Sequence, residues 1–392
     1  MSPARRRIEP AERRARLARR HGLAPGCRST DVVEATRRIV CLHATDPTTV
    51  YLSAWARVDG FAREDLDRAL YEDRSLIKHM AMRRTLFVFP RETIPAAVAG
   101  PSARVALAER KRLIKDVEAS GVHADGATWL AAAGDAVLEL LADGRAHTST
   151  ELREVLPAIG GKVTSGTGKW AATIPVAPRV LTVLSAEGRV VRGPNDGAWT
   201  TSRPRWTSMA SWLGEPVAPM DAQDGTTELV RGWLRAFGPG TTADMKWWLG
   251  GTVAGVKAAL AALAAVEVDL GGGETGWALP ADLEPEAPVE PWAALLPSLD
   301  PTIMGWQSRD WYIAPHREHL FDYAGNAGHS AWWDGRAVGG WRQAEDGVIE
   351  LQLLEDVGAQ ALTALEAEAE RLTAWLAGTR HLPRFPSPLS KR

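Results

Sequence analysis

Apolar positions in the first hundred residues recur at helical spacing and give way to two short apolar runs. We predict helices at residues 9–21, 30–42, 47–58 and 63–71. The runs at residues 75–80 and 85–89 predict short strands. Asp46, directly before Pro47, is typical of a helix N-cap because its side chain accepts hydrogen bonds from the free N–H groups of a first turn. Several helices followed by a strand pair indicate a winged-helix unit.

The same order of elements recurs in the next hundred residues. Thr148 and Glu151 have the spacing of a capping box at the start of an amphipathic helix. A second helix is predicted at residues 174–187. Residues 188–201 predict a hairpin around a turn of Gly, Asn and Asp, with several arginines on or beside it. This segment therefore predicts a second winged-helix unit with a basic wing.

A third copy of the pattern follows about ninety residues after the first capping box. Thr241 and Asp244 repeat the capping-box spacing, between helices predicted at residues 228–237 and 253–263. Residues 266–279 predict a hairpin that turns at three consecutive glycines. Because this hairpin is acidic, we do not expect it to contact phosphate.

The pattern changes from residue 285 onward, where glycine turns separate short apolar strands and an amphipathic helix at residues 359–377 ends the chain. The fold class is therefore α+β, with three tandem winged-helix units and a β-rich, barrel-like C-terminal part. The predicted boundaries are 1–100 for the first unit, which holds the candidate catalytic triplet, 101–205 for the second, 206–284 for the third and 285–392 for the C-terminal domain.

Composition places the chain among ordinary globular proteins, with 392 residues, 45% hydrophobic and 24% charged. No apolar run approaches the ~20 residues of a membrane span, and no apolar stretch follows the N-terminal arginines as in a secretory signal. We therefore expect a cytoplasmic protein. Cys27 and Cys41 show neither C-x-x-C nor His/Cys ligand spacing, so we expect no disulfide, no metal and no cofactor.

Charge is unevenly distributed, although the net charge is only -2. Residues 1–20 contain eight arginines and two glutamates, whereas residues 267–290 are acidic and contain no Lys or Arg. A nucleic-acid surface needs such segregation because phosphate neutralisation supplies most non-specific affinity. The arginine run is equally typical of a solvated helix face, and both interpretations stay open.

Several segments together resemble one family, the winged-helix AlkZ-like DNA glycosylases. They follow the order of that family across nearly the whole chain, and they are Leu42-His-Ala-Thr-Asp-Pro47, Ala54-Trp-Ala-Arg57, Met82-Arg-Arg-Thr85, Phe237-Gly-Pro-Gly-Thr241, Leu296-Pro-Ser-Leu-Asp300 and Asp334-Gly-Arg-Ala-Val-Gly339. The family carries a Gln–apolar–Gln catalytic triplet just before the third helix of the first unit. That place reads His43-Ala44-Thr45 here.

The resemblance implies a cofactor-free, monofunctional DNA glycosylase of base excision repair. Its expected substrate is duplex DNA with alkylated bases of the N7-alkylguanine or N3-alkyladenine type, including bulky adducts, and self-resistance to a DNA-alkylating natural product is one role that suits this activity. We predict no protein partner and a monomer. The alternative is a non-enzymatic winged-helix DNA-binding protein, either a regulator or a damage sensor, because a fold does not decide a function.

The candidate catalytic residues are His43, Thr45 and Asp46. On an extended link, side chains two apart point to the same side, so His43 and Thr45 would hold one water. A neutral imidazole with a pKa of about 6.5 accepts a proton from that water, and the Thr45 hydroxyl orients it. Two alternatives remain: His43 as a helix-terminal histidine satisfied by a backbone carbonyl, and Asp46 as an N-cap rather than a stabiliser of the sugar cation.

The candidate DNA-binding residues are basic side chains on predicted turns, wings and one helix. They are Arg83, Arg84, Lys169, Arg179, Arg189, Arg192 and Arg203. For Arg83 and Arg84 a surface ion pair is the alternative. The tryptophans, 17 in all, are expected in the core rather than as platforms for base stacking.

Overall fold

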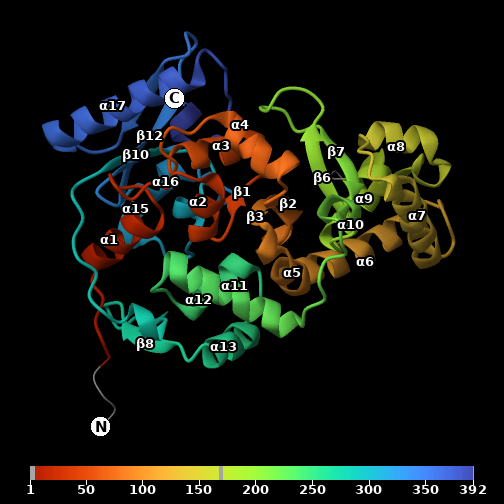
Figure 1. The fold of residues 1–392 in the computed structure, drawn as a ribbon, viewed down its shortest axis with the longest axis horizontal. Coiled ribbons are helices and arrows are strands. Elements are labelled where there is room, and N and C mark those ends of the chain that lie inside the picture. The colour runs from red at the N-terminus through yellow and green to blue at the C-terminus, as the bar shows by residue number, and fades with distance from the viewer. Residues whose placement is uncertain (1–4, 167–170, 392) are drawn as a thin grey trace.

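The computed structural model describes residues 5–166 and 171–391, so the predicted contact Lys169 lies outside the described residues. Figure 1 shows a larger body and a smaller lobe beside it. The body contains the first segment (residues 5–100), the third segment (209–278) and the C-terminal segment (293–391). The lobe is the second segment (residues 103–208), which leaves the body through helix α6.

The first segment surrounds a small antiparallel sheet. Its helices are α1 (Pro10–Arg20), α2 (Val32–Arg38), α3 (Pro47–Trp55), α4 (Arg63–Asp67) and α5 (Ile94–Ala97), and its strands are β1 (Leu42–His43), β2 (Leu76–Met80) and β3 (Leu86–Pro90). The strand order is β1-β3-β2, with His43 opposite Phe87. The predicted helices and strand pair are confirmed. Asp46 is the N-cap of α3, as predicted, and accepts the Thr48 N–H at 3.0 Å.

The second segment contains four helices and two hairpins. The helices are α6 (Ala103–Ala119), α7 (Gly126–Leu140), α8 (Ser149–Val155) and α9 (Ala177–Ala186), and the hairpins pair β4 (Lys162–Ser165) with β5 (Ala172–Pro175) and β6 (Val190–Asn195) with β7 (Pro204–Ser208). The capping box of Thr148 and Glu151 is confirmed. A separate hydrophobic core, which includes Leu113, Val137 and Leu181, holds this segment together.

Two predicted boundaries in the second segment are wrong. The helix predicted from residue 174 begins at Ala177, because the residues before it pair with β4. The second strand of the basic hairpin lies at Pro204–Ser208 rather than at residues 198–201. Its register is set by burial, since Trp206 is 5% exposed and lies opposite Arg192.

The third segment contains α10 (Met209–Leu213), α11 (Ala222–Phe237), α12 (Thr242–Leu249) and α13 (Val253–Ala262), followed by the hairpin of β8 (Val266–Asp269) and β9 (Thr275–Ala278). The capping box of Thr241 and Asp244 is confirmed, as is the hairpin with its glycine turn. Helix α11 begins six residues before its predicted start because Asp221, not a residue nearer to 228, caps it.

The C-terminal segment is an open sheet covered by a helix. Strands β10 (Ala293–Leu296), β11 (Ser330–Trp333), β12 (Arg336–Gln343) and β13 (Ile349–Leu353) pair in sequence order, and the helices are α14 (Pro301–Met304), α15 (Asp310–Ile313), α16 (Arg317–Leu320) and α17 (Gly358–Leu376). The prediction of a barrel-like part is wrong. Within the described residues β10 and β13 are the two edges of the sheet, and α17 contacts both instead of letting them close.

The N-terminal arginines face the acidic segment of the same chain. Arg7 lies 3.6 Å from Asp269, and Arg19 lies 2.7 Å from Glu286. Arg5 pairs with Glu267 in the same way. Several cations of the arginine run therefore pair with carboxylates of the same chain, while the side chains of Arg5 and Arg7 stay about half exposed.

One continuous hydrophobic core joins the first, third and C-terminal segments. A fully buried ion pair lies within it: an Nη of Arg57 is 2.6 Å from Asp300, whose other oxygen accepts the Ser53 hydroxyl at 2.6 Å. The winged-helix identity of the three units and the four-part division stay predictions. In the described part of the chain, every helix is too short or too polar to cross a bilayer.

Candidate nucleic-acid interface

Two cavities lie on the two sides of the turn that joins β2 to β3. Arg83 and Arg84 in this turn both have left-handed backbone conformations, with φ of 54° and 63°. Such conformations cost about 1–3 kcal/mol for residues with a Cβ and concentrate at functional sites. As a result the two consecutive side chains diverge, and Arg84 lines one cavity while Arg83 lines the other.

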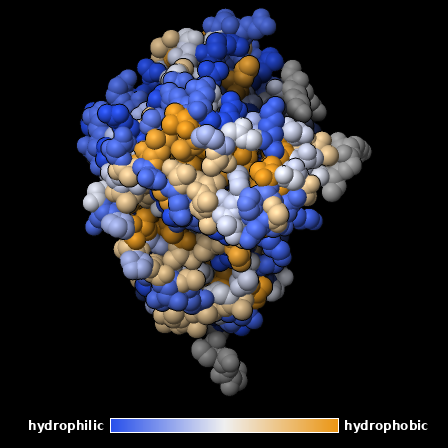
Figure 2. Space-filling view, turned by 90° about the vertical axis from the view of Figure 1, so that its right-hand side faces the viewer, coloured by the Kyte–Doolittle hydropathy of each residue, from blue (hydrophilic) through white to orange (hydrophobic). Residues whose placement is uncertain are grey.

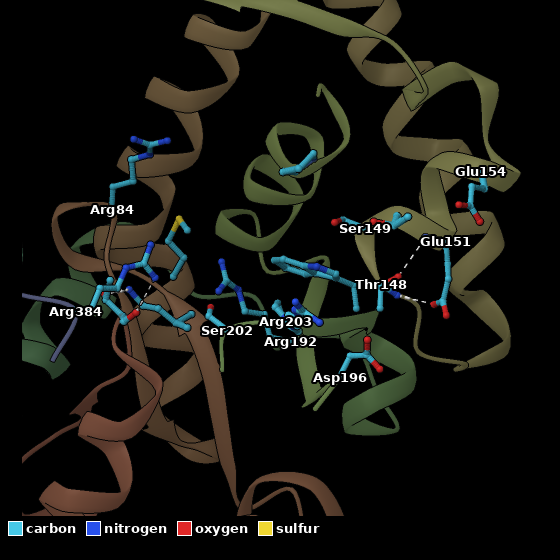
Figure 3. A pocket seen from close by; sticks show the side chains of 17 residues that line it. Arg84, Thr148, Ser149, Glu151, Glu154, Arg192, Asp196, Ser202, Arg203 and Arg384 are labelled. Carbon is cyan, nitrogen blue, oxygen red and sulfur yellow. Dashed lines mark hydrogen bonds between the residues drawn. The ribbon is translucent and has the colours of Figure 1, made fainter. Parts of the chain in front are cut away.

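The first cavity, called the cleft below, has a volume of about 820 Å³ and separates the first segment from α8 and the β6–β7 hairpin. Figure 3 shows Arg84 and Arg384 on the side of the first segment, Glu151 and Glu154 on the side of α8, and Arg192 and Arg203 between them. The outer face of this lobe, in contrast, mixes hydrophilic and hydrophobic residues (Figure 2), so the case for a nucleic-acid surface comes from the cleft.

Four arginines surround the cleft, and three of them form no ion pair within the described residues. Arg84 pairs with Glu109 at 3.0 Å. Arg192, Arg203 and Arg384 have no carboxylate partner in the part of the chain that the structure describes. Burial, together with the neighbouring charge of Arg384, lowers the pKa of Arg192 to about 10, so Arg192 is still a cation at neutral pH. These arginines suit the phosphates of a nucleic acid.

Two of the carboxylates that line the cleft, Glu151 and Asp196, contact other residues of the protein. Glu151 accepts the backbone N–H of Thr148 at 2.8 Å and lies 2.9 Å from a guanidinium nitrogen of Arg205. Asp196 lies 3.7 Å from the same guanidinium group. Arg205 thereby offsets part of the negative charge on this side of the cleft, whereas Glu154 forms no ion pair within the described residues.

Apolar side chains also line the cleft. Met80 and Leu86 come from the strand pair, and Trp206 comes from β7. The guanidinium group of Arg192 lies 4.8 Å from the centre of the Trp206 ring. The cleft thus combines cations with a flat aromatic surface, a combination that suits sugars and bases as well as phosphates.

Thr45 is the predicted catalytic residue that lines the cleft. Its Oγ1 accepts the backbone N–H of Leu86 at 3.2 Å, and its carbonyl accepts a guanidinium N–H of Arg384 at 3.4 Å. A hydroxyl has one donor and two acceptor sites. Thr45 therefore keeps its own proton and one lone pair for a molecule in the cleft.

His43 does not face the cleft, which differs from the prediction that it shares a water with Thr45. Its side chain is 4% exposed and lines the second cavity. Its Nδ1 accepts the backbone N–H of Thr45 at 3.4 Å, so the neutral ring carries its proton on Nε2. Burial, together with the nearby charge of Arg83, lowers the pKa of His43 to about 3. At neutral pH the ring is uncharged.

Asp46 uses both carboxylate oxygens in structural contacts. Oδ1 accepts the backbone N–H and the hydroxyl of Thr48, at 3.0 and 2.7 Å. Oδ2 accepts the backbone N–H of Arg384 at 2.9 Å. The group is 3% exposed, so it fixes the start of α3 and the C-terminal tail to each other.

The structure separates the predicted DNA-binding residues into three groups. Arg84, Arg192 and Arg203 line the cleft, and Arg83 lines the second cavity. Arg179 pairs with Asp116, and Arg189 lies 3.4 Å from Asp135. Neither of these last two arginines lines the cleft.

Sequence reasoning missed Arg384 and Trp206. Arg384 belongs to the tail after α17, and no local pattern reveals that this tail returns to Asp46, more than three hundred residues earlier. Trp206 was missed because the second strand of the hairpin was predicted at residues 198–201 and lies at Pro204–Ser208. The burial of β7 gives no simple alternation, because Trp206 and Thr207 are consecutive and both buried.

The second cavity, called the arginine cavity below, has a volume of about 560 Å³. It lies between the first, third and C-terminal segments. The residues that line it include His43, Arg83, Trp247, Arg309, Arg317 and Tyr323.

Comparisons with known proteins identify the family of the chain and proteins with a similar fold. A family model described as "DNA glycosylase AlkZ-like" matches residues 36–375. No curated protein matches the chain. Among solved structures the chain is similar to "Streptomyces sahachiroi DNA glycosylase AlkZ", with 21% identity, coverage of 96% of this chain and 99% of that chain, and a TM-score of 0.74. At this identity the structural likeness shows a shared fold.

Proposed function

Because the chain belongs to the AlkZ-like DNA glycosylase family, we propose that it hydrolyses the N-glycosidic bond of alkylated bases in duplex DNA. The expected lesions are N7-alkylguanine and N3-alkyladenine, including bulky adducts. The observation that carries this proposal is the cleft, which Thr45 lines together with Arg84, Arg192, Arg203 and Arg384.

The arginines bind the DNA backbone in this proposal. Each phosphate contact releases condensed counterions, so duplex affinity falls steeply with salt and shows little sequence preference. Among the residues that the structure describes, Arg192, Arg203 and Arg384 have no carboxylate partner, and in this proposal they contact phosphates directly. Arg84 exchanges its contact with Glu109 for a phosphate.

Little catalytic machinery is needed for this substrate class. A purine alkylated at a ring nitrogen carries a positive charge, which makes it a good leaving group. The enzyme then has to hold the lesion and place one water near C1′ of the sugar. The free proton and lone pair of the Thr45 hydroxyl orient that water. Water, not an amine of the protein, attacks, so the proposed reaction is monofunctional.

His43 and Asp46 act as positioning residues in this proposal. Nδ1 of His43 holds the backbone N–H of Thr45, and the uncharged ring packs edge-on against Phe87 at 4.9 Å. Asp46 holds the first turn of α3 and the backbone of Arg384. Both residues thereby keep the Thr45 hydroxyl and the Arg384 guanidinium at the same wall of the cleft.

The second candidate function is DNA binding without catalysis. It is favoured by one observation: neither His43, with its pKa lowered to about 3, nor Asp46, with both oxygens engaged, offers a free general base to the cleft. A regulator of this kind binds a defined sequence, whereas a repair enzyme binds most duplexes alike.

One assay separates the two candidates. The protein is incubated with a duplex that contains N7-methylguanine, and alkali then cleaves the strand at abasic sites. We expect cleavage at the lesion with the wild-type protein and a strong decrease with His43→Ala, in which Thr45 loses its backbone acceptor. Binding without any base release favours the non-enzymatic candidate. Action as a monomer and a role in self-resistance stay predictions.

A further inference from the structure

The arginine cavity lies on the opposite side of the β2–β3 turn from the cleft, and the mechanism proposed above does not use its cations. Arg83 reaches it from the turn, and Trp247 comes from α12. Arg309 and Arg317 come from the C-terminal segment, next to and within its short helices. Two segments therefore bring three guanidinium groups to one cavity, and a third segment adds the Trp247 ring.

The most buried of these groups is Arg309, which is 3% exposed. Its guanidinium group lies 4.9 Å from the centre of the Trp247 ring and 4.7 Å from that of Phe321. Its Nε is buried and has no hydrogen-bond partner. Arg83 lies over the same Trp247 ring at 4.0 Å. Aromatic rings thus orient both cations without neutralising them.

No carboxylate in the described part of the chain forms an ion pair with Arg83, Arg309 or Arg317. Asp322 also lines the cavity, but its oxygens accept the backbone N–H groups of Ala324 and Asn326, at 2.9 and 2.8 Å. It accepts the side-chain amide of Asn326 as well, at 2.9 Å. The Asp322 carboxylate thus stabilises the turn that contains it, and the cavity keeps an excess of positive charge.

An unpaired, buried cation is costly unless an anion from outside completes its contacts. Guanidinium groups match phosphate oxygens by paired N–H donors, so a phosphate ester is the fitting anion. The volume of about 560 Å³ exceeds what one phosphate group needs and leaves room for its sugar. Tyr323 is fully exposed at the lining and offers a flat face beside it.

We propose that the arginine cavity binds a backbone phosphate of DNA. The neighbouring phosphate of the same strand contacts Arg84 in the cleft. This inference rests on the proposed function, because it requires duplex DNA in the cleft. Arg83 and Arg84 are consecutive, with Cα atoms about 3.8 Å apart, and their side chains diverge from the turn. Charges on one DNA strand recur every ~3.4 Å along its axis, so one strand that crosses the turn reaches both arginines.

The test uses the salt dependence of duplex binding by the full-length protein. Arg317→Gln removes an exposed cation, and Arg83→Asn removes another while keeping a residue that tolerates the left-handed backbone. Each variant should lower the slope of log affinity against log salt by about one, which is on the order of a fivefold loss of affinity at 0.15 M salt. Arg342→Gln is the control, because Arg342 pairs with Glu350 at 2.7 Å and lines neither cavity.

Two results would overturn the inference while leaving the proposed function intact. The first is an unchanged slope in both variants although Arg192→Gln lowers it. The second is saturable binding of deoxyguanosine monophosphate that Arg317→Gln abolishes without changing the duplex slope, which assigns the cavity to a free nucleotide. If the wild-type protein binds no duplex at all, the proposed function fails together with the inference.

Discussion

The cleft and the arginine cavity begin at adjacent residues of one turn, yet their charges are arranged differently. In the cleft, Arg84 pairs with Glu109 and Arg205 pairs with Glu151, so cations with and without an ion pair lie side by side, and carboxylates line the same cavity. In the arginine cavity the guanidinium groups of Arg83 and Arg309 rest on aromatic rings and form no ion pair among the described residues. The net charge of a surface is therefore a poor guide to binding, and the partners of each cation decide what it offers to DNA.

The N-terminal arginines likewise show that the partners of a cation decide what it offers to DNA. The first twenty residues form the densest basic run of the sequence, but Arg7 before α1 and Arg19 and Arg20 within it pair with acidic residues of the stretch 269–286. Variants that change the partners of these cations, and not only their number, therefore test the difference between the cleft and the arginine cavity.

The largest effect is expected from removing the unpaired cations of the cleft. The triple variant Arg192→Gln, Arg203→Gln, Arg384→Gln should lower duplex affinity by roughly a hundredfold at 0.15 M salt, because three phosphate contacts are lost. Fluorescence anisotropy at several salt concentrations measures the affinity and its slope. A slope equal to that of the wild-type protein would remove the cleft from the DNA-binding surface.

The next effect concerns the histidine in the wall of the arginine cavity. Because burial lowers the pKa of His43 from 6.5 to about 3, the unfolded chain binds a proton first as pH falls. The stability from the neutral ring is complete above pH 6.5 and is lost progressively between pH 6.5 and about 3. Between pH 7 and 5 the loss is about 2 kcal/mol.

Urea unfolding of His43→Gln at pH 7 and 5 tests this statement. The decrease in the free energy of unfolding between the two pH values should be about 2 kcal/mol smaller than in the wild-type protein. The other buried histidines, such as His79, remain in both proteins and cancel in the comparison. An identical decrease in both proteins would mean that the ring is protonated in the folded state.

The smallest effect on duplex affinity is expected from removing the carboxylate that pairs with Arg84, which leaves this cation without an ion pair, as in the arginine cavity. Glu109→Gln removes the carboxylate that pairs with Arg84. The side chain of Glu109 is 10% exposed, and that of Arg84 is 53% exposed. Since an exposed ion pair is worth about 0–1 kcal/mol, duplex affinity should rise by up to about fivefold. A decrease in affinity would show that Glu109 positions Arg84 for DNA instead of competing with it.

Local features of the fold were predictable because they depend on neighbouring residues. The caps of Asp46, Thr148 and Thr241 each satisfy free N–H groups two or three residues ahead, and all three occur as expected. The closure of the C-terminal sheet was not predictable in this way. Whether β10 meets β13 depends on where α17 packs, and that is a property of the whole segment.

The candidate site was predictable in its residues but not in its geometry. Alternation of side chains places His43 and Thr45 on one side only if the strand continues, and β1 ends at His43. The separation of Arg83 from Arg84 depends on two left-handed residues, which no spacing rule indicates for arginine. Arg384 joins the site through a hydrogen bond to Asp46 across most of the chain.

The most direct test of the central claim is the single-turnover release of N7-methylguanine from a duplex by Thr45→Val and Thr45→Ser. Valine removes the hydroxyl in the cleft at nearly the same volume, whereas serine keeps it. The account predicts a loss of roughly a hundredfold in the release rate for Thr45→Val, unchanged duplex affinity, and a rate near that of the wild-type protein for Thr45→Ser. Equal release rates in both variants, or a loss that follows affinity alone, would contradict it.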